Sequence, residues 1–426
     1  MIDTSKNKNT GVALYLGSAI LWLIIGTSIG EYLGIKFVSP EIDTQPWLSF
    51  GRLRPVHTNM VFWGWASMGM MGLAHYVVPR ACLTPSQRPA LQVWSAWFTN
   101  AAVLLGSLSL MMGINNSGGE YREYIWPIAV LFGAGVVLSL TSLWATVRER
   151  TVKVIPISAQ YIISAHIFVL VISFMAYQPF WQDGIGETII QGYYMHQGVG
   201  MWFMMCTLGL FYYFIPQMTG RYVLSEQLGR VAFWSQIVFY TVIGTHHFIF
   251  SSIPWWLQVV AIIGSVGMII PVVAGTINFL SCFRTNWRKV GSTAPLAFFL
   301  TSVVFYITGS LQGTAEAFQF TNLMWHFTDY TVAHSHLTMY GIITFAIWGG
   351  MYSVWTETSN VTSKHRALLQ LQFLLSLIGL LVYTIPLMIG GSLRGLSWMN
   401  GAPFMESVEL MVPFWAWRAI GGTLMW

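Results

Sequence analysis

The sequence predicts an all-α protein embedded in a lipid bilayer, and three observations lead to this fold class. Of the 426 residues, 55% are hydrophobic and only 8% are charged, whereas about a quarter of the residues of soluble domains are charged. The mean hydropathy is +0.60. Apolar stretches of about 20 residues, the length of a membrane-spanning helix, recur along the whole chain. We therefore expect a polytopic bundle of about twelve transmembrane helices.

The individual helices are placed by reading apolar windows of about that length along the chain. The predicted spans cover residues 11–33, 55–79, 90–113, 125–147, 155–177, 188–216, 229–252, 255–281, 294–315, 329–354, 367–391 and 407–426. No linker, low-complexity tract or convincing internal repeat separates them, so we expect one transmembrane domain over residues 1–426. The last span is short, which fits a helix that is truncated at residue 426.

The lysines and arginines sort to one side of this arrangement. One side receives Lys6, Lys8, Arg80, Arg88, Arg148, Arg150, Lys153, Arg221, Arg230, Arg284, Arg288, Lys289, Lys364 and Arg366. The other side receives only Lys36, Arg52, Arg54, Arg122 and Arg394, and Arg418 lies within the last span. The positive-inside rule then places both termini in the cytoplasm. No basic run indicates nucleic-acid binding.

Six histidines fall at one depth once the orientation is set. The outer third of the membrane contains His57, His196, His246, His247, His334 and His336. Ionisable groups at membrane depth indicate function by default. A single buried histidine can equally be an interhelical hydrogen-bonding residue, but six at one depth favour a ligand set. For His75, His166, His326 and His365 we expect structural roles, with His326 as a candidate exception.

The spacing of these histidines suits metal and heme chemistry. His334 and His336 are about 200° apart around a helix, so one helix can ligate irons on both of its sides. His57 can complete a six-coordinate iron with one of them, and the other leaves an iron with an open position for a gas. The adjacent His246 and His247 can form a three-imidazole site with His196, which suits copper or iron.

A tyrosine and the cysteines complete this picture. Tyr240 lies about two helical turns before His247, where a phenol can supply a proton or an electron; on spacing alone it can equally be a packing or interfacial tyrosine. Cys82, Cys206 and Cys282 are scattered and form no disulfide framework, and no C-x-x-C-H motif attaches a c-type heme. Any c-type heme therefore arrives on another chain.

Several motifs carry a resemblance to a known family. They are FGRLRPVHTN, YYMHQGVGMWF, FYTVIGTHHF and HFTDYTVAHSH, and GGEYREYIWP and RAIGG also fit. At these residues the chain resembles the heme–copper oxidase superfamily, catalytic subunit I, most closely the C-family (cbb-type) cytochrome c oxidase. It is related more distantly to the large subunit of nitric oxide reductase. The likeness runs in consistent order from about residue 48 to the end.

The resemblance implies a role for each ligand. His57 and His336 would be the axial ligands of a low-spin heme b, and His334 the proximal ligand of a high-spin heme b. His196, His246 and His247 would bind copper B. Tyr240 matches the active-site tyrosine, which C-family oxidases join covalently to a copper-ligating histidine.

The resemblance also implies roles around the hemes. Arg54, His326 and Asp329 would lie near heme propionates. Glu120 and Glu123 would help to hold a calcium ion or a propionate, although two acids in an outer loop are more often simply solvated.

The residues at a few sequence positions distinguish two branches of the superfamily. Nitric oxide reductases use iron in place of copper, lack the tyrosine, and carry a glutamate one turn after the first metal histidine. That position is Gly200 here and Tyr240 is present, which favours oxygen reduction. Gln312 points the other way, because C-family oxidases typically have a glutamate there, close to the proximal histidine. Glu316, one turn further on, could partly replace it.

The sequence therefore predicts an oxidoreductase of the respiratory chain that reduces O₂ to water, with proton uptake and with membrane-attached c-type cytochromes as partner subunits. We expect it in the bacterial inner membrane, with its metal sites toward the periplasm. The alternative is NO reduction to N₂O with non-heme iron at the three histidines. More distant alternatives are a histidine-relay transporter, which would be colourless, and an inactive homologue, which the intact ligand set disfavours.

Overall fold

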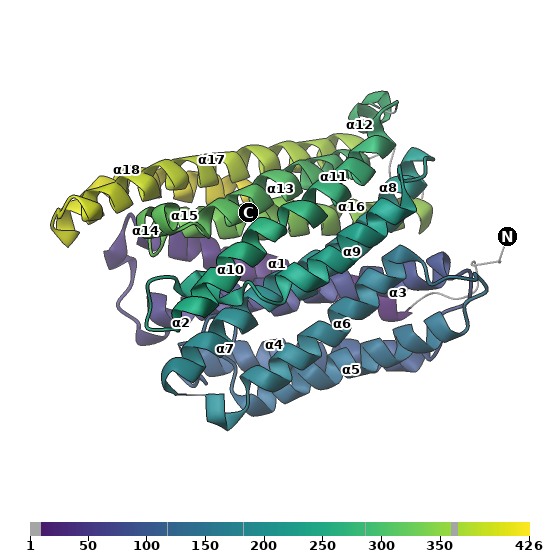
Figure 1. Ribbon diagram of the computed structural model, residues 1–426, viewed down its shortest axis with the longest axis horizontal. Coiled ribbons are helices and arrows are strands. Elements are labelled where there is room, and N and C mark those ends of the chain that lie inside the picture. Colours follow the sequence, from purple (N-terminus) through teal and green to yellow (C-terminus); the bar gives the residue numbers. More distant parts are fainter. Residues whose placement is uncertain (1–9, 117, 182, 286, 359–364) are drawn as a thin grey trace.

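The computed structural model describes residues 10–116, 118–181, 183–285, 287–358 and 365–426. Within these residues the regular elements are all helical, and Figure 1 shows the long helices side by side along the longest axis of the molecule. The all-helical fold class is therefore confirmed. Lys6, Lys8 and Lys364, which contribute to the predicted orientation, lie outside the described residues.

The long elements form twelve consecutive rods in the described part of the chain. They are α1 (Thr10–Lys36), α2–η3–α3 (Phe50–Asn59, Met60–Ala66, Ser67–Ala81), α4 (Pro89–Met111), α5 (Trp126–Arg148), α6 (Ile157–Ala176), α7–η5–α8 (Gly184–Gln197, Gly198–Met204, Met205–Thr219), α9 (Glu226–Tyr240), α10–α11 (Trp255–Gly267, Ile269–Phe283), α13 (Ala294–Glu316), α15–η7–α16 (Asp329–His336, Leu337–Thr344, Phe345–Thr358), α17 (Arg366–Met399) and α18 (Phe404–Met425). Short helices lie between some of the rods: η1 (Pro40–Ile42), η2 (Pro46–Leu48), η4 (Pro179–Trp181), η6 (Gly244–Phe248), α12 (Trp287–Ser292) and α14 (Gln319–Trp325).

Nine of these rods are long and apolar enough to cross a membrane by themselves. The other three are the α2–η3–α3 rod, α9 and α18. The first begins with the polar turn that contains Arg52 and Arg54, α9 has only 15 residues, and α18 carries Glu406, Glu409 and Arg418. The predicted total of about twelve spans is consistent with this arrangement.

One predicted helix ends earlier than the sequence suggested, and this changes the surroundings of two site residues. The span predicted over residues 229–252 stops as an α-helix at Tyr240, and His246 and His247 lie in the separate 3₁₀ turn η6. Gly244 allows this turn to lie directly against α7, because a Cβ atom at Gly244 would be 2.6 Å from the Cα atom of Tyr193. The expectation that both histidines lie on the helix was wrong.

Three of the rods contain a π-helical segment next to a site histidine. Segment η3 begins three residues after His57, η5 two residues after His196, and η7 directly after His336. A π-helical turn inserts an extra residue into an α-helix, and such turns occur frequently at functional sites. Here they rotate the following part of each helix relative to the part that carries the histidine.

A buried arginine holds the loop between α4 and α5 against the neighbouring helices. The Arg122 side chain is fully buried. Its guanidinium donates to the Ala176 carbonyl at 2.7 Å, to Gln191 Oε1 at 3.1 Å and to Glu187 Oε1 at 3.2 Å. It therefore fixes the start of α7, the element that carries His196.

We expect Arg122→Ala to lower the stability of the folded protein by about 2–4 kcal/mol, because it leaves several buried acceptors without a donor. The measurement is the thermal-unfolding midpoint of the detergent-solubilised protein. Arg148→Ala, in the exposed last turn of α5, is the matched control and should unfold like the wild type. Equal midpoints for both variants would contradict this account of the loop.

Candidate functional site

Three histidines from two elements converge at one point of the bundle. His196 comes from α7 and His246 and His247 from η6, and one ligand atom of each lies within 4.8 Å of the others. His196 Nδ1 and His247 Nε2 face each other at 2.8 Å. The ring centroids of His246 and His247 are 4.5 Å apart. The structure thus brings together the three residues that the sequence grouped.

The surroundings of these rings fit a metal ion. The Nδ1 atom of His246 is bonded to the Ser265 hydroxyl at 2.8 Å, which leaves its Nε2 atom for a ligand. His196 Nε2 is buried and has no hydrogen-bond partner in the described part of the chain. Three imidazoles with ligand nitrogens within 4.8 Å of one another form a donor set that binds copper or iron.

Tyr240 occupies the space beside this cluster. Its ring stacks on His196 with centroids 4.6 Å apart and planes at 16°. It also fills the position opposite Gly200, where a Cβ atom would lie only 1.6 Å from Tyr240 Cζ. Gln197 donates to the Tyr240 carbonyl at 2.8 Å. The tyrosine can therefore lie beside His196 only because residue 200 has no side chain.

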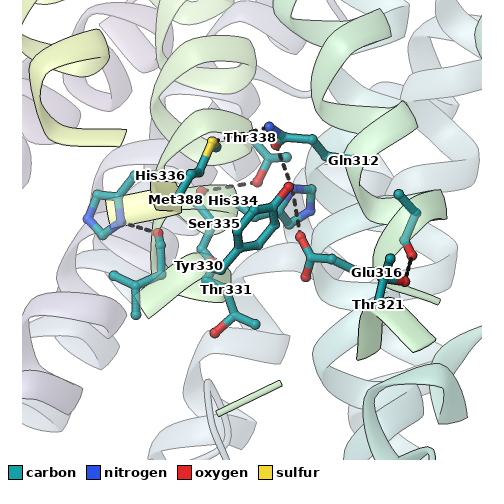
Figure 2. Close-up of polar contacts among 12 residues, drawn as sticks. Gln312, Glu316, Thr321, Tyr330, Thr331, His334, Ser335, His336, Thr338 and Met388 are labelled. Carbon is teal, nitrogen blue, oxygen red and sulfur yellow. Dashed lines mark hydrogen bonds and ion pairs between the residues drawn. The ribbon is translucent and has the colours of Figure 1, made fainter. Parts of the chain in front are cut away.

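His334 lies close to the three-histidine cluster on the first helical turns of the α15 rod. It interacts electrostatically with His196, His246 and His247. Figure 2 shows its ring between Gln312 and Glu316 of α13. Its Nδ1 atom lies 3.3 Å from Gln312 Oε1 and 3.4 Å from Glu316 Oε1, both longer than a typical N–H···O bond. The Nε2 atom remains available for an iron.

His57 and His336 line a cavity between α1, α2, α15, α17 and α18. His57 Nδ1 donates to the Gly26 carbonyl at 2.7 Å, and His336 Nδ1 to the Val332 carbonyl at 2.8 Å. Because a carbonyl only accepts, the Nε2 atom of each neutral ring is unprotonated and free to bind iron. The empty volume is about 1410 Å³, including space open to the surroundings. Two histidines with free Nε2 atoms in one mostly apolar cavity fit a heme with two axial imidazoles.

The charged residues of this cavity include some that the sequence singled out and some that it missed. Arg54 lines it in an ion pair with Glu120. Asp329 lines it as well, and accepts from Arg394 and from Trp415 Nε1, each at 3.0 Å.

The sequence did not assign Glu31 and Arg418, which line the same cavity. The Nε atom of Arg418 is buried without a hydrogen-bond partner in the described residues. The signal for Arg418 that the sequence offered was its position within a predicted membrane span.

Of the other three residues that the resemblance assigned, Glu120 lines this cavity, whereas His326 and Glu123 are not among its lining residues. His326 follows α14, packs against Phe327 and is not part of the cavity lining; its electrostatic neighbours are His246 and His247. Glu123 is buried, and accepts a bond from Asn59 at 2.9 Å. Burial raises the pKa of Glu123 to about 7. Both carboxylates therefore have protein partners.

Residues 11–424 match the family described as cytochrome c and quinol oxidase polypeptide I. The chain belongs to this family. The predicted resemblance to the catalytic subunit I of heme–copper oxidases is thereby confirmed.

Individual relatives in the oxidase family agree with this assignment. The chain is 29% identical over 425 residues to the Cbb3-type cytochrome c oxidase subunit CcoN1 of Stutzerimonas stutzeri, covering 95% of this chain and 89% of the relative. It is 26% identical to a cytochrome c oxidase subunit 1 homolog of Agrobacterium tumefaciens, covering 96% and 79%. A solved heme–copper terminal oxidase dimer shares the fold with a TM-score of 0.78 at 16% identity, covering 98% of this chain and 82% of that chain.

The contact between Tyr240 and Gly200 leads to a first test of the site. We expect Gly200→Ala to displace Tyr240 from His196, because the added methyl group overlaps the tyrosine ring, and overpacking of this kind costs about 1–3 kcal/mol. The measurements are the thermal midpoint and the metal content of the purified variant. Gly198→Ala is the control, since a Cβ atom there meets nothing within 4 Å. Wild-type behaviour of Gly200→Ala would contradict the packing described.

The raised pKa of Glu123 leads to a pH dependence of stability. The folded protein holds this proton up to about pH 7, whereas an unburied glutamate loses it near 4.5. Stability should therefore fall as the pH rises from about 4.5 to 7, by on the order of 2 kcal/mol. Glu123→Gln should flatten this decline in thermal midpoints measured with a calcium chelator present. An unchanged pH profile would show that the carboxyl group is not responsible.

Proposed function

We propose that this chain is the catalytic subunit of a cbb-type cytochrome c oxidase that reduces O₂ to water. The observation that carries this proposal is Tyr240, stacked on His196 in the space that Gly200 leaves open. A phenol in contact with a metal-ligating imidazole can supply a proton and an electron at the reaction site. The names of the relatives, Cbb3-type cytochrome c oxidase subunit CcoN1 among them, support the same activity.

The histidines divide into three ligand sets in this proposal. His57 and His336 hold a low-spin heme b, and His334 holds a high-spin heme b. His196, His246 and His247 hold copper B. When bound, the hemes and the copper would supply electron transfer and the reduction of O₂, with His57, His336, His334, His196, His246 and His247 as the residues that would hold them.

The residues of the chain itself orient and protect this chemistry. Carbonyls of Gly26 and Val332 fix the tautomers of His57 and His336, and the Ser265 hydroxyl fixes the ring orientation of His246. The Tyr240 hydroxyl gives a proton to the reduced oxygen. The stacking of Tyr240 on His196 supports the covalent link between tyrosine and histidine that the resemblance implies.

The proximal histidine has an unusual pair of neighbours in this scheme. An amide, Gln312, stands where C-family oxidases typically place a carboxylate, and it polarises His334 less. Glu316 approaches the same nitrogen from the next turn of α13. We infer that the two side chains share the role of orienting His334.

The propionate and calcium sites follow from the charges around the hemes. Arg54 and Asp329 lie beside the low-spin heme cavity, and Arg418 offers a further buried donor to a propionate there. His326 lies instead near the three-histidine cluster, where it interacts electrostatically with His246. A calcium ion at Glu120 and Glu123 has to compete with Arg54 for the Glu120 carboxylate.

The location and partners of the protein complete the proposal. The distribution of lysine and arginine supports a multi-pass protein of the bacterial inner membrane with both termini in the cytoplasm and the metal sites toward the periplasm. Electrons arrive from membrane-attached c-type cytochrome subunits, because the chain has no C-x-x-C-H motif of its own. Protons for water formation are taken up from the cytoplasm.

A second candidate function is the reduction of NO to N₂O with non-heme iron at His196, His246 and His247. Gln312 is the observation that favours it, since it departs from the C-family pattern. Gly200 and Tyr240 favour oxygen, because a glutamate at residue 200 could not coexist with the tyrosine ring in its present position.

We expect Tyr240→Phe to keep both heme spectra and to lose most oxygen turnover, by about 10²-fold or more, since the phenol is the nearby proton donor. Turnover is measured with reduced cytochrome c or an artificial donor in the purified complex. Tyr193→Phe, an α7 tyrosine beside Gly244, serves as the control. If Tyr240→Phe consumed O₂ at the wild-type rate, the oxidase proposal would lose its main support.

The ligand sets are tested by optical spectroscopy of single histidine variants. His57→Ala or His336→Ala should remove the low-spin heme signal, whereas His334→Ala should keep that signal and abolish gas binding at the high-spin iron. His365→Ala, before α17, is the control and should leave both spectra unchanged. Low-spin spectra retained in both of the first two variants would show that the ligands are assigned incorrectly.

A further inference from the structure

The cavity that His57 and His336 line, here called the His57–His336 cavity, is bordered by several charged side chains. Besides the two histidines, its charged lining residues are Glu31, Arg54, Glu120, Asp329 and Arg418. Arg54 is paired with Glu120, and Asp329 is paired with Arg394. Glu31 of α1 and Arg418 of α18 therefore remain, and charged groups within membrane spans are costly and indicate function by default.

Glu31 reaches the cavity from α1 and lies against α18. Its Oε1 atom accepts a hydrogen bond from the Thr423 hydroxyl at 2.8 Å. Its Oε2 atom occupies the space beside Gly422, where an added Cβ atom would be only 2.2 Å away. A bond from Trp426 Nε1 to Ser28 Oγ at 2.8 Å joins the same two helices about one turn further along. The missing side chain at residue 422 thus leaves room for the carboxylate at the cavity wall.

Arg418 lies one helical turn before Gly422 on the same helix. Its guanidinium carbon is 4.4 Å from the centre of the Phe37 ring, and its buried Nε atom has no hydrogen-bond partner in the described residues. The carboxylate of Glu31 attracts this guanidinium electrostatically. Because a buried charge is stabilised by an opposite charge nearby, removal of the Glu31 carboxylate would leave the positive charge of Arg418 less compensated.

The charges of this pair act on the surroundings of both cavity histidines. Arg418 interacts electrostatically with His57 and with His336. Tyr383 interacts electrostatically with Glu31 and with Arg418. The Tyr383 ring packs in turn on the His336 ring, with centroids 4.4 Å apart. The acid and the base are therefore placed where they influence whatever the two histidines bind.

A charge beside this cavity changes the redox equilibrium of a heme bound there. The oxidised, ferric heme carries one positive charge more than the reduced, ferrous heme. A carboxylate therefore stabilises the ferric form and lowers the midpoint potential, whereas a guanidinium raises it. Water screens these effects weakly in a mostly apolar cavity. The potential determines how readily such a heme accepts electrons from a c-type cytochrome and passes them on.

We propose that Glu31 lowers the midpoint potential of the low-spin heme by holding a negative charge at the cavity wall, against the positive charge of Arg418. The inference rests on the proposed function, because it requires a heme between His57 and His336. Glu31 is not a ligand in this proposal, and its effect on the heme is electrostatic. A polar side chain can also join two membrane helices through a hydrogen bond alone. The variants below separate the charge of Glu31 from its bond to Thr423.

The experiment is an optical redox titration of the low-spin heme in the purified oxidase complex. Glu31→Gln keeps the shape of the side chain and an oxygen that accepts from Thr423, but it removes the charge. We expect the midpoint potential to rise, so that the ferric-to-ferrous ratio at a fixed potential falls about tenfold, or about 59 mV for a one-electron couple. Arg418→Gln should lower the potential, and the double variant should return toward the wild-type value, because the two charges oppose each other.

Two further variants serve as controls in the same titration. Glu31→Asp retains the negative charge and should keep the potential close to that of the wild type. Glu409→Gln removes an exposed acid of α18 that is not part of the cavity lining. Its potential should equal that of the wild type, because water screens an exposed charge strongly.

A wild-type potential in Glu31→Gln would overturn the proposal. So would an equal shift in Glu31→Asp, or loss of the low-spin heme in Glu31→Gln, because either result indicates a structural role rather than a role of the charge. The proposed function fails in a different way, since the wild-type complex would then show no low-spin heme spectrum. That result would overturn both, whereas an unshifted potential with the heme present would overturn the role of Glu31 alone.

Discussion

The site depends on one constraint, which is that four of its histidines have one ring nitrogen directed at a protein group outside the ligand set. His57 and His336 donate to backbone carbonyls within helices, His246 is bonded to Ser265, and His334 lies between Gln312 and Glu316. An imidazole has only two nitrogens, so the second one is left for a metal and its direction is fixed. The positions of α1, α10, α13 and α15 are therefore coupled directly to the chemistry that the histidines can perform.

The lipid environment places a second constraint on the backbone around the site. In lipid, backbone and side-chain polar groups must find partners inside the protein, which leaves helices as the main structure. The chain departs from regular helix next to the ligands, in η3, η5, η6 and η7. These departures place His196 beside His247 and let Tyr240 occupy the space at Gly200. Local irregularity of the backbone is thus concentrated where the metals would bind.

The sequence could predict about twelve spans and the grouping of His196, His246 and His247, because hydropathy determines where membrane helices form and the histidine spacing sets which rings can meet. It could not predict that α9 stops at Tyr240, since the apolar run FYTVIGTHHFIF continues without a break and only Gly244 marks the turn. It did not indicate the π-helical segments, which depend on packing between helices. Ser265 gives no local signal of its bond to His246. Arg418 did give a signal, as a charge inside a span, but its place in the lining of the His57–His336 cavity needed the fold.

The most direct test of the central claim is the iron and copper content per chain of the purified protein, together with its optical spectrum. The division of the histidines into two heme sites and a copper site predicts two irons, both in heme b, and one copper for each chain. Three irons with no copper would contradict the oxidase account and assign the three-histidine site to non-heme iron. The absence of a heme spectrum would contradict both reductase functions.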